Sequence, residues 1–209
     1  YRFNVSNTRA EQVTVSISVN GVSLADTPLI TFTPGEPNLL VIISQPESSV
    51  AGNPIANTPA VRVSDEFGNN IPGLDIDVTE QDGQNFASGT DRISTNSQGV
   101  AEFTDLVITD AGRYNLVFSE SSGLTVTSNA FNVNAGSPDA AETTATVPNG
   151  AAGDATAITI TVRDSFQNPV EGVAGQLVLS ISGANTGTAF TSITDQGNGV
   201  YTTSYVPTS

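Results

Sequence analysis

Apolar and polar residues alternate with a period of two along much of this 209-residue chain. The clearest runs are 13–19, 114–118 and 158–162, with Thr, Ser and Asn at most of the polar positions. This alternation is typical of strands that bury one face and expose the other, and the β-branched Thr favours strand over helix. Turn signals such as Asn20-Gly21 and Asn198-Gly199 separate the runs. The pattern therefore predicts an all-β fold made of sandwiches.

An internal repeat divides the chain. Asp65 and Asp164 are 99 residues apart, as are Phe67 and Phe166 and also Asn69 and Asn168. A period of about 100 residues is the length of one immunoglobulin-like sandwich, so we expect tandem immunoglobulin-like β-sandwiches. Short Pro/Gly stretches at 34–37 and 135–138 mark the expected linkers. The expected segments are the C-terminal strands of a preceding domain (1–35), a complete domain (36–135) and a domain without its final strands (136–209).

Composition excludes several classes of function. Lys+Arg is 6 against Asp+Glu 21, and there is no Cys or His. Disulfides, thiolate zinc sites and Ser–His catalysis are therefore excluded. The net charge of −15 argues against nucleic acid and anionic membrane surfaces as partners, and no apolar run approaches the roughly 20 residues of a membrane span. The excess of acidic residues indicates either a solubilising surface or a protein from a high-salt habitat. Only the second interpretation predicts that stability rises steeply towards molar salt.

Several segments resemble the bacterial immunoglobulin-like domains of invasin- and intimin-type adhesins and of large repetitive surface proteins. The residues that carry the resemblance are VRVSDEFGNNIPG at 61–73, echoed by VRDSFQNPVEG at 162–172, and QGVAEFTDLVITDAGRYNLVF at 98–118. TSNAFNVNAGSP at 127–138 and the hairpin-like 13–35 resemble final strands with exit linkers. The resemblance implies a non-enzymatic stalk, spacer or adhesin, outside the cell on a bacterial surface.

Two groups of acidic residues are candidate sites. Asp65 and Asp164 open matching turns, where a carboxylate either binds a ligand or accepts backbone N–H groups; the turn chemistry favours the second interpretation. Asp75 and Asp77 share one strand face, and with Asp82 they are candidate Ca²⁺ ligands, because Ca²⁺ takes six to eight oxygens. The linker acids Glu36, Asp139 and Glu142 are an alternative Ca²⁺ set. No other cofactor is expected, and nothing supplies the tuned acid and base that a glycosidase needs.

The alternation also predicts the core. Phe67 and Phe166 lie in the turns and are expected to plug the turn side of the core. The expected core residues of 36–135 are Val61, Val63, Ile71, Val78, Val100, Phe103, Tyr114, Leu116, Phe118, Phe131 and Val133. Those of 136–209 are Ile158, Ile160, Val162, Leu177, Leu179, Ile181, Tyr201 and Tyr205.

Three functional hypotheses remain open. The first is a segment of a surface stalk, adhesin or filament whose partners are neighbouring repeats. The second is a fibre subunit in which residues 1–35 of one chain complete 136–209 of another by strand addition. The third is a module that binds a host or surface glycan or protein. An exposed aromatic cluster would favour this third hypothesis, and burial of its members would favour a spacer; the candidates are Phe67, Phe86, Phe166 and Phe190.

Overall fold

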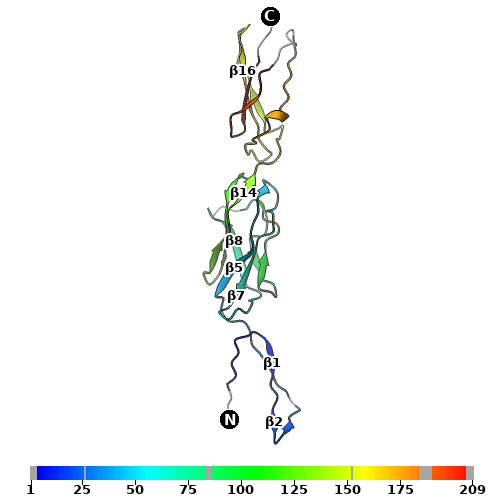
Figure 1. Cartoon of the computed structure of the whole chain (residues 1–209), viewed down its shortest axis with the longest axis vertical. Coiled ribbons are helices and arrows are strands. Elements are labelled where there is room, and N and C mark those ends of the chain that lie inside the picture. Colours follow the sequence, from blue (N-terminus) through cyan, green and yellow to red (C-terminus); the bar gives the residue numbers. More distant parts are fainter. Residues whose placement is uncertain (1–3, 26, 83–85, 152, 184–189, 206–209) are drawn as a thin grey trace. The chain divides into compact units, whose positions relative to one another are not determined.

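The computed structural model describes residues 4–25, 27–82, 86–151, 153–183 and 190–205. Within these ranges the fold is built from short strands and one 3₁₀ turn, η1 (Ala174–Gln176) (Figure 1). None of the described helical residues forms an element long and apolar enough to cross a membrane. The first strands are β1 (Gln12–Thr14), β2 (Ser18–Val19), β3 (Val22–Ser23), β4 (Leu29–Thr31), β5 (Leu39–Ser44), β6 (Ser49–Val50), β7 (Ala60–Ser64), β8 (Asp75–Glu80) and β9 (Arg92–Ser94). The remaining strands are β10 (Val100–Glu102), β11 (Gly112–Tyr114), β12 (Leu116–Glu120), β13 (Thr125–Thr127), β14 (Phe131–Asn134), β15 (Thr144–Thr146), β16 (Thr156–Thr161), β17 (Thr194–Asp195) and β18 (Val200–Tyr205).

The chain forms two compact units. Unit 1 comprises Tyr1–Glu47, Ile55–Leu106 and Tyr114–Phe131. Unit 2 comprises Ser48–Pro54, Val107–Arg113 and Asn132–Ser209. The domain boundaries expected at the two Pro/Gly linkers stay predictions.

Unit 1 contains two sheets with alternating inward residues. One has the order β10-β7-β5 and the other β13-β12-β8-β9, with antiparallel neighbours throughout. In β7, Val61 and Val63 are fully buried, whereas Arg62 between them is exposed. Phe103, next to β10, meets Phe118 of β12 with ring centroids 5.4 Å apart. The period-two pattern thus builds the predicted sandwich core.

A second type of strand pairing joins the ends of the 36–135 segment. Within unit 2, Val133 of β14 pairs with Ser49 of β6, and Asn134 pairs with Val50, both in parallel orientation. The amide of Ala51 extends the ladder by donating to the carbonyl of Asn134 at 2.8 Å. The first and last parts of the segment are therefore hydrogen-bonded side by side.

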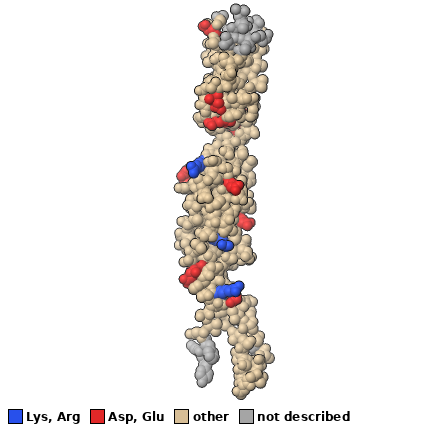
Figure 2. All heavy atoms as spheres, viewed as in Figure 1, with Lys and Arg blue, Asp and Glu red and all other residues tan. Residues whose placement is uncertain are grey.

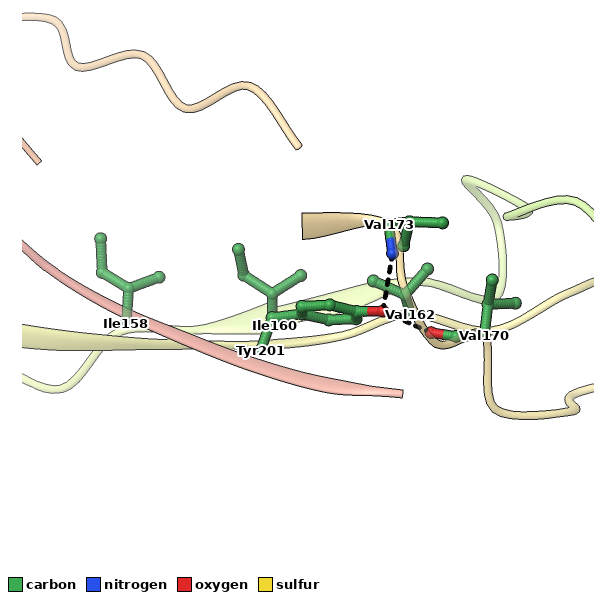
Figure 3. Packing of buried hydrophobic residues seen from close by; sticks show 6 residues of the cluster. All are labelled: Ile158, Ile160, Val162, Val170, Val173 and Tyr201. Carbon is green, nitrogen blue, oxygen red and sulfur yellow. Dashed lines mark hydrogen bonds between the residues drawn. The ribbon is translucent and has the colours of Figure 1, made fainter. Parts of the chain in front are cut away.

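Unit 2 also contains the antiparallel sheet β15-β16-β18-β17. Its core centres on Tyr201, which is fully buried with Ile158, Ile160, Val162, Val170 and Val173 around it. The Tyr201 hydroxyl points between two backbone groups (Figure 3). It donates to the carbonyl of Val170 at 2.8 Å and accepts from the amide of Val173 at 3.2 Å. This tyrosine therefore fills the core and also satisfies two buried backbone groups.

The core prediction is confirmed at most positions. Six of the expected residues are only partly buried: Ile71, Val100, Tyr114, Leu177, Leu179 and Tyr205. The expectation for Ile181 is wrong, because 37% of this residue is exposed. Ile76 and Leu106 were not predicted, yet both are fully buried.

In the described part of the N-terminal segment, the strands form two two-stranded sheets. β1 pairs with β4, and β2 pairs with β3. Asn20 and Gly21 join β2 to β3 with φ values of 53° and 80°, as the predicted two-residue turn requires. This segment leaves large apolar residues in solvent: Val5, Ile17, Val19, Val22, Leu24 and Leu29.

Candidate functional site: a repeated carboxylate turn

Asp65 follows strand β7 and organises the turn behind it. Its Oδ1 accepts the amides of Phe67 at 3.0 Å and Asn69 at 2.8 Å. Its Oδ2 accepts the amide of Gly35 at 2.9 Å and the side-chain amide of Asn69 at 2.8 Å. Asp65 is 4% exposed, and both of its carboxylate oxygens accept two hydrogen bonds each. The prediction that it shapes the turn is confirmed.

Asp164 makes the same contacts in unit 2. Its Oδ1 accepts the amides of Phe166 and Asn168, each at 2.9 Å. Its Oδ2 accepts the amide of Gly136 at 2.7 Å and the side-chain amide of Asn168 at 2.9 Å. In both turns the Asp carboxylate accepts the amide of a linker glycine, Gly35 or Gly136. Each carboxylate therefore ties its turn to the linker that precedes the strands of the same repeat.

The asparagine of each turn reaches a second segment of chain. Asn69 accepts the amide of Ala10 at 2.8 Å and donates to the carbonyl of Thr8 at 2.8 Å. Asn168 accepts the amide of Ala111 and donates to the carbonyl of Thr109, both at 2.7 Å. The two pairs of partners share the pattern Thr-x-Ala and are 101 residues apart. We call each set of Asp, Asn, linker Gly and Thr-x-Ala backbone a carboxylate clamp.

The clamps depend on ionised carboxylates. The Asn69 side chain and the Gly35 amide lower the pKa of Asp65 to about 2. Burial of Asp164 raises its pKa, but the Asn168 side chain and the amides of Gly136, Asn168 and Phe166 outweigh burial and lower it overall.

Acid is therefore expected to open the clamps. A folded-state pKa below the unfolded value of about 3.8 means that the stabilisation is complete above about pH 4. It is lost as the pH falls through the folded-state pKa towards 2. Urea midpoints measured between pH 6 and pH 2 should fall mainly below pH 4. In the Asp65→Asn variant this fall should be smaller, and an unchanged slope would contradict the assignment.

The expectation that Phe67 and Phe166 plug the core is wrong. Phe67 is 59% exposed and Phe166 is 42% exposed. The backbone amide of each Phe binds the carboxylate of the Asp two residues earlier, and the aromatic side chain is left exposed on the turn. Phe166 nevertheless has a neighbour, because its ring lies over Gly52.

Gly52→Ala is expected to destabilise unit 2 by about 2 kcal/mol. Gly52 has a φ of +79°, and a Cβ there would clash with Cε2 of Phe166. Urea unfolding measures the change. The same substitution in a Phe166→Ala background should cost less, because only the backbone strain remains. Equal costs in both backgrounds would show that the ring does not contact Gly52.

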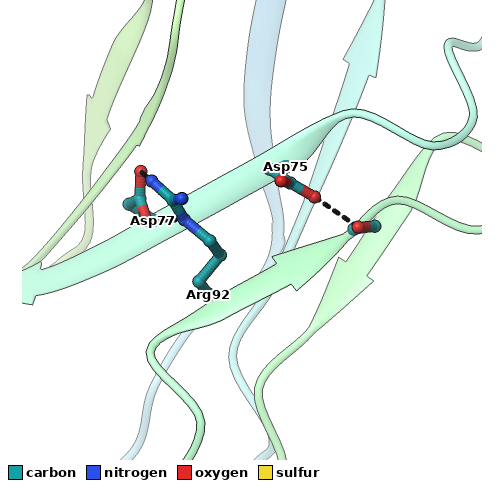
Figure 4. A network of polar contacts seen from close by, with 4 residues as sticks. Asp75, Asp77 and Arg92 are labelled. Atoms are coloured by element: carbon teal, nitrogen blue, oxygen red, sulfur yellow. Dashed lines mark hydrogen bonds and ion pairs between the residues drawn. The ribbon is translucent and has the colours of Figure 1, made fainter.

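The predicted Ca²⁺ ligands have protein partners. Asp77 forms a two-point ion pair with Arg92, with contacts of 2.6 and 2.8 Å (Figure 4). Asp75 accepts the Ser94 hydroxyl, and Asp82 is exposed in the turn after β8. Arg92 lowers the pKa of Asp77 by its hydrogen bond and its charge. No three acidic side chains in the described ranges are grouped as a metal site; Ca²⁺ binding stays a prediction.

Two of the three alternative linker acids accept hydrogen bonds from different protein groups. Asp139 accepts the amide of Ala141 at 2.8 Å, and Glu142 accepts the Gln167 side chain at 3.0 Å. Glu36 is exposed. Over the face in Figure 2, most of the surface is uncharged, and charged side chains stand in small separate groups.

The four candidate aromatics do not share one environment. Phe67 and Phe166 are exposed, whereas Phe86 and Phe190 are partly buried. Phe190 packs against Tyr205 with ring centroids 6.0 Å apart. Neither an exposed cluster of all four nor burial of all four is therefore found.

Sequence reasoning missed the asparagine contacts and the Thr-x-Ala partner. The signal was available, because Thr8 and Ala10 recur as Thr109 and Ala111. It is a weak signal, since the contacts use the backbone of these residues and not their side chains.

The chain was compared with solved structures, and those of bacterial adhesins match it. The Escherichia coli adhesin FdeC matches with a TM-score of 0.59 and 19% identity, over 95% of this chain and 65% of that chain. Invasin, a bacterial integrin-binding protein, matches with a TM-score of 0.38 and 20% identity, over 82% of this chain and 34% of that one. The D00-D0 domain of intimin matches with a TM-score of 0.37 and 16% identity, over 58% and 63%.

The similarity to FdeC confirms the expected fold class. The chain has the immunoglobulin-like β-sandwich fold found in bacterial adhesins. It spans about two thirds of the FdeC structure. No protein-family model and no curated protein matches the sequence.

Proposed function

We propose that this chain is a load-bearing segment of an extracellular bacterial surface stalk or adhesin built from tandem immunoglobulin-like repeats. Its role is mechanical and not enzymatic. The adhesin fold and the 99- to 101-residue sequence repeat support this proposal. Its immediate partners are neighbouring repeats, and the whole protein would present a surface to a host or surface glycan or protein.

The pairing of β6 with β14 carries the proposal. Tension along a stalk pulls the start of a repeat away from its end. Because β6 and β14 run parallel, that tension loads their hydrogen bonds in shear, so several must break together. Val133 and Asn134 pair with Ser49 and Val50, and the Ala51 amide adds a further bond.

The carboxylate clamps support the same function at the junctions. With the predicted boundaries, Thr109 and Ala111 belong to one repeat and Asp164 and Asn168 to the next. Each clamp then joins consecutive repeats through backbone hydrogen bonds and also fixes the linker glycine. Charge-assisted hydrogen bonds of this kind are among the stronger ones in proteins.

Pulling single molecules of the 209-residue chain tests the proposal. Unfolding of residues 36–135 should lengthen the molecule in one step. The added length is about 3.4 Å per unfolded residue minus the length of the folded repeat. Ala51→Pro removes an N–H group from the shear-loaded ladder and should lower the unfolding force of that step. Ala101→Gly is the control, since it weakens the core through β10 and leaves β6 and β14 intact.

A lower force in Ala51→Pro than in Ala101→Gly, at similar thermodynamic stability, supports the load-bearing role. The proposal fails if the step needs no more force in the parent chain than in Ala51→Pro. It also fails if residues 36–135 do not unfold as one step.

A further inference from the structure

We propose that the outer face of the sheet β10-β7-β5 in unit 1 binds the same face of a second copy of this chain. The contact joins two copies through the faces of their sheets. The proposal rests on the stalk function proposed above, which brings many copies close together on one surface, and adds a lateral partner to it.

Strand β5 is apolar on both of its faces. Leu40 is buried in the core, whereas Leu39 and Ile43 are 51% and 46% exposed. Val41 pairs with exposed Arg62 and so belongs to the outer face, where it is partly buried. Strands with apolar residues on both faces are typical of sheets that are covered on both sides. The outer side of β5 therefore has the composition of a covered surface.

The two neighbouring strands continue this outer face. Arg62 of β7 lies between Val41 of β5 and Val100 of β10, and Val100 is partly buried. Glu102 of β10 is exposed and lies two residues beyond Val100, hence on the same side of the strand. Neither Arg62 nor Glu102 forms an ion pair with another residue in the described part of the chain. The face thus carries one positive and one negative charge among apolar side chains.

The outer faces of two other sheets are polar. The sheet β13-β12-β8-β9 of unit 1 presents mainly acidic and hydroxyl side chains: Asp75, Asp77, Thr79, Arg92, Ser94, Ser119, Thr125 and Thr127. Across the sheet β15-β16-β18-β17 of unit 2 runs a row of paired threonines: Thr146, Thr159, Thr202 and Thr194. Outer faces that stay in solvent are usually polar in antiparallel sheets, and these two follow that rule. The face of β5, β7 and β10 departs from it.

The apolar face belongs to a sheet whose strands all lie within unit 1. The sequence continues well beyond this sheet in both directions. Leu39 and Ile43 remain exposed in the presence of the flanking segments. Burial of this face therefore requires another molecule.

A second copy of the chain is the partner that fits the charges of this face. The net charge of −15 makes two copies repel each other over most of their surface. The face with one Arg and one Glu has no net charge, so this repulsion is weakest there. In a contact between two identical faces, Arg62 of each copy can also meet Glu102 of the other.

The expected contact is small and transient. Three short strands about 4.8 Å apart offer a face of about 300 Å² in projection. A stable interface buries roughly 800 Å² on each partner. We therefore expect a dissociation constant of about 1 mM for the 209-residue chain. Parallel contacts between neighbouring stalks on one surface would strengthen the association through their high local concentration.

NMR spectra of the ¹⁵N-labelled 209-residue chain locate the contact. They are recorded from about 0.05 to about 2 mM protein at about 0.15 M salt, where screening limits the repulsion between acidic copies. Amide signals of β5, β7 and β10 should shift with concentration. Those of β8 and β9, on the polar face of the same sandwich, should stay in place.

Two charge reversals test the identity of the partner. Arg62→Glu leaves two negative charges on the face, and Glu102→Arg leaves two positive charges. Each variant alone should associate at least about tenfold more weakly than the parent chain, because like charges then face each other. An equimolar mixture should associate at least as tightly as the parent. Arg113→Glu is the control for net charge, since it reverses an exposed Arg on β11, outside this face.

A second pair of variants tests the apolar part of the face. Leu39→Asp places a charge on exposed β5 and should also weaken association at least about tenfold. Thr125→Asp places the same charge on exposed β13 of the polar face and should associate as the parent does. The dispersion of the NMR signals shows whether each variant is folded, and the mixture adds a check, because an unfolded variant cannot restore association.

The absence of concentration-dependent shifts up to about 2 mM would overturn the proposal. Shifts on β8 and β9 instead of β5, or a Leu39→Asp variant that associates as the parent does, would also overturn it. So would a mixture of the two charge variants that associates no better than its components. The pulling experiment uses single molecules, so a failure of lateral association is distinguishable from a failure of the load-bearing function.

Discussion

Asp164→Ala is expected to lower the free energy of unfolding of unit 2 by about 3 kcal/mol. Asp164 is 1% exposed and accepts hydrogen bonds from three backbone amides and from the Asn168 side chain. Alanine leaves these donors without their acceptor and frees Asn168 from its fixed orientation. The loss is measurable by urea unfolding followed through NMR signals of residues 158–162.

Ser165→Ala is the matched control for this substitution. Ser165 lies in the same turn and is exposed, so its replacement should change stability by less than about 0.5 kcal/mol. If both variants lose the same stability, the carboxylate does not organise the turn. A second readout is the exchange of the Ala111 amide, which should become faster only in Asp164→Ala, because Asn168 Oδ1 holds that amide.

Tyr201→Phe is expected to destabilise unit 2 by about 2 kcal/mol. The substitution keeps the ring in a fully buried site but removes the hydroxyl that bonds both Val170 and Val173. A buried carbonyl and a buried amide then lose their partner, which costs more than the absence of one exposed hydrogen bond. Urea unfolding with the same NMR signals measures the effect.

Tyr205→Phe is the control on the same strand. Tyr205 is partly buried, so water can replace contacts of its hydroxyl. We expect a clearly smaller loss than for Tyr201→Phe. Equal losses would mean that burial of the Tyr201 hydroxyl does not set the cost.

The alternating pattern predicted the strands well because it reflects a geometric property of the backbone. Val61 and Val63 are buried on either side of exposed Arg62, as a pleated strand requires. The internal repeat predicted the matching turns of Asp65 and Asp164, because Asp side chains accept nearby N–H groups in turns.

The outward direction of Phe67 and Phe166 was not predictable from residue type. Aromatic residues are usually core residues, but here both belong to turns whose backbone amides bind the Asp carboxylate, and both are exposed. Ile181 was misassigned because alternation identifies a face without showing whether another strand covers it. The partners of Asn69 and Asn168 lie 57 to 61 residues away and contribute backbone atoms, so side-chain patterns carry little information about them.

We propose that the carboxylate clamps hold consecutive repeats together in a load-bearing array. ¹⁵N relaxation of the 209-residue chain at pH 6, with and without the Asp164→Asn substitution, tests this role. We expect the amides of 60–106 and of 156–205 to share one rotational correlation time in the parent chain. In the variant, residues 156–205 should tumble faster than residues 60–106. Separate correlation times already in the parent chain, or identical relaxation in the variant, would contradict it.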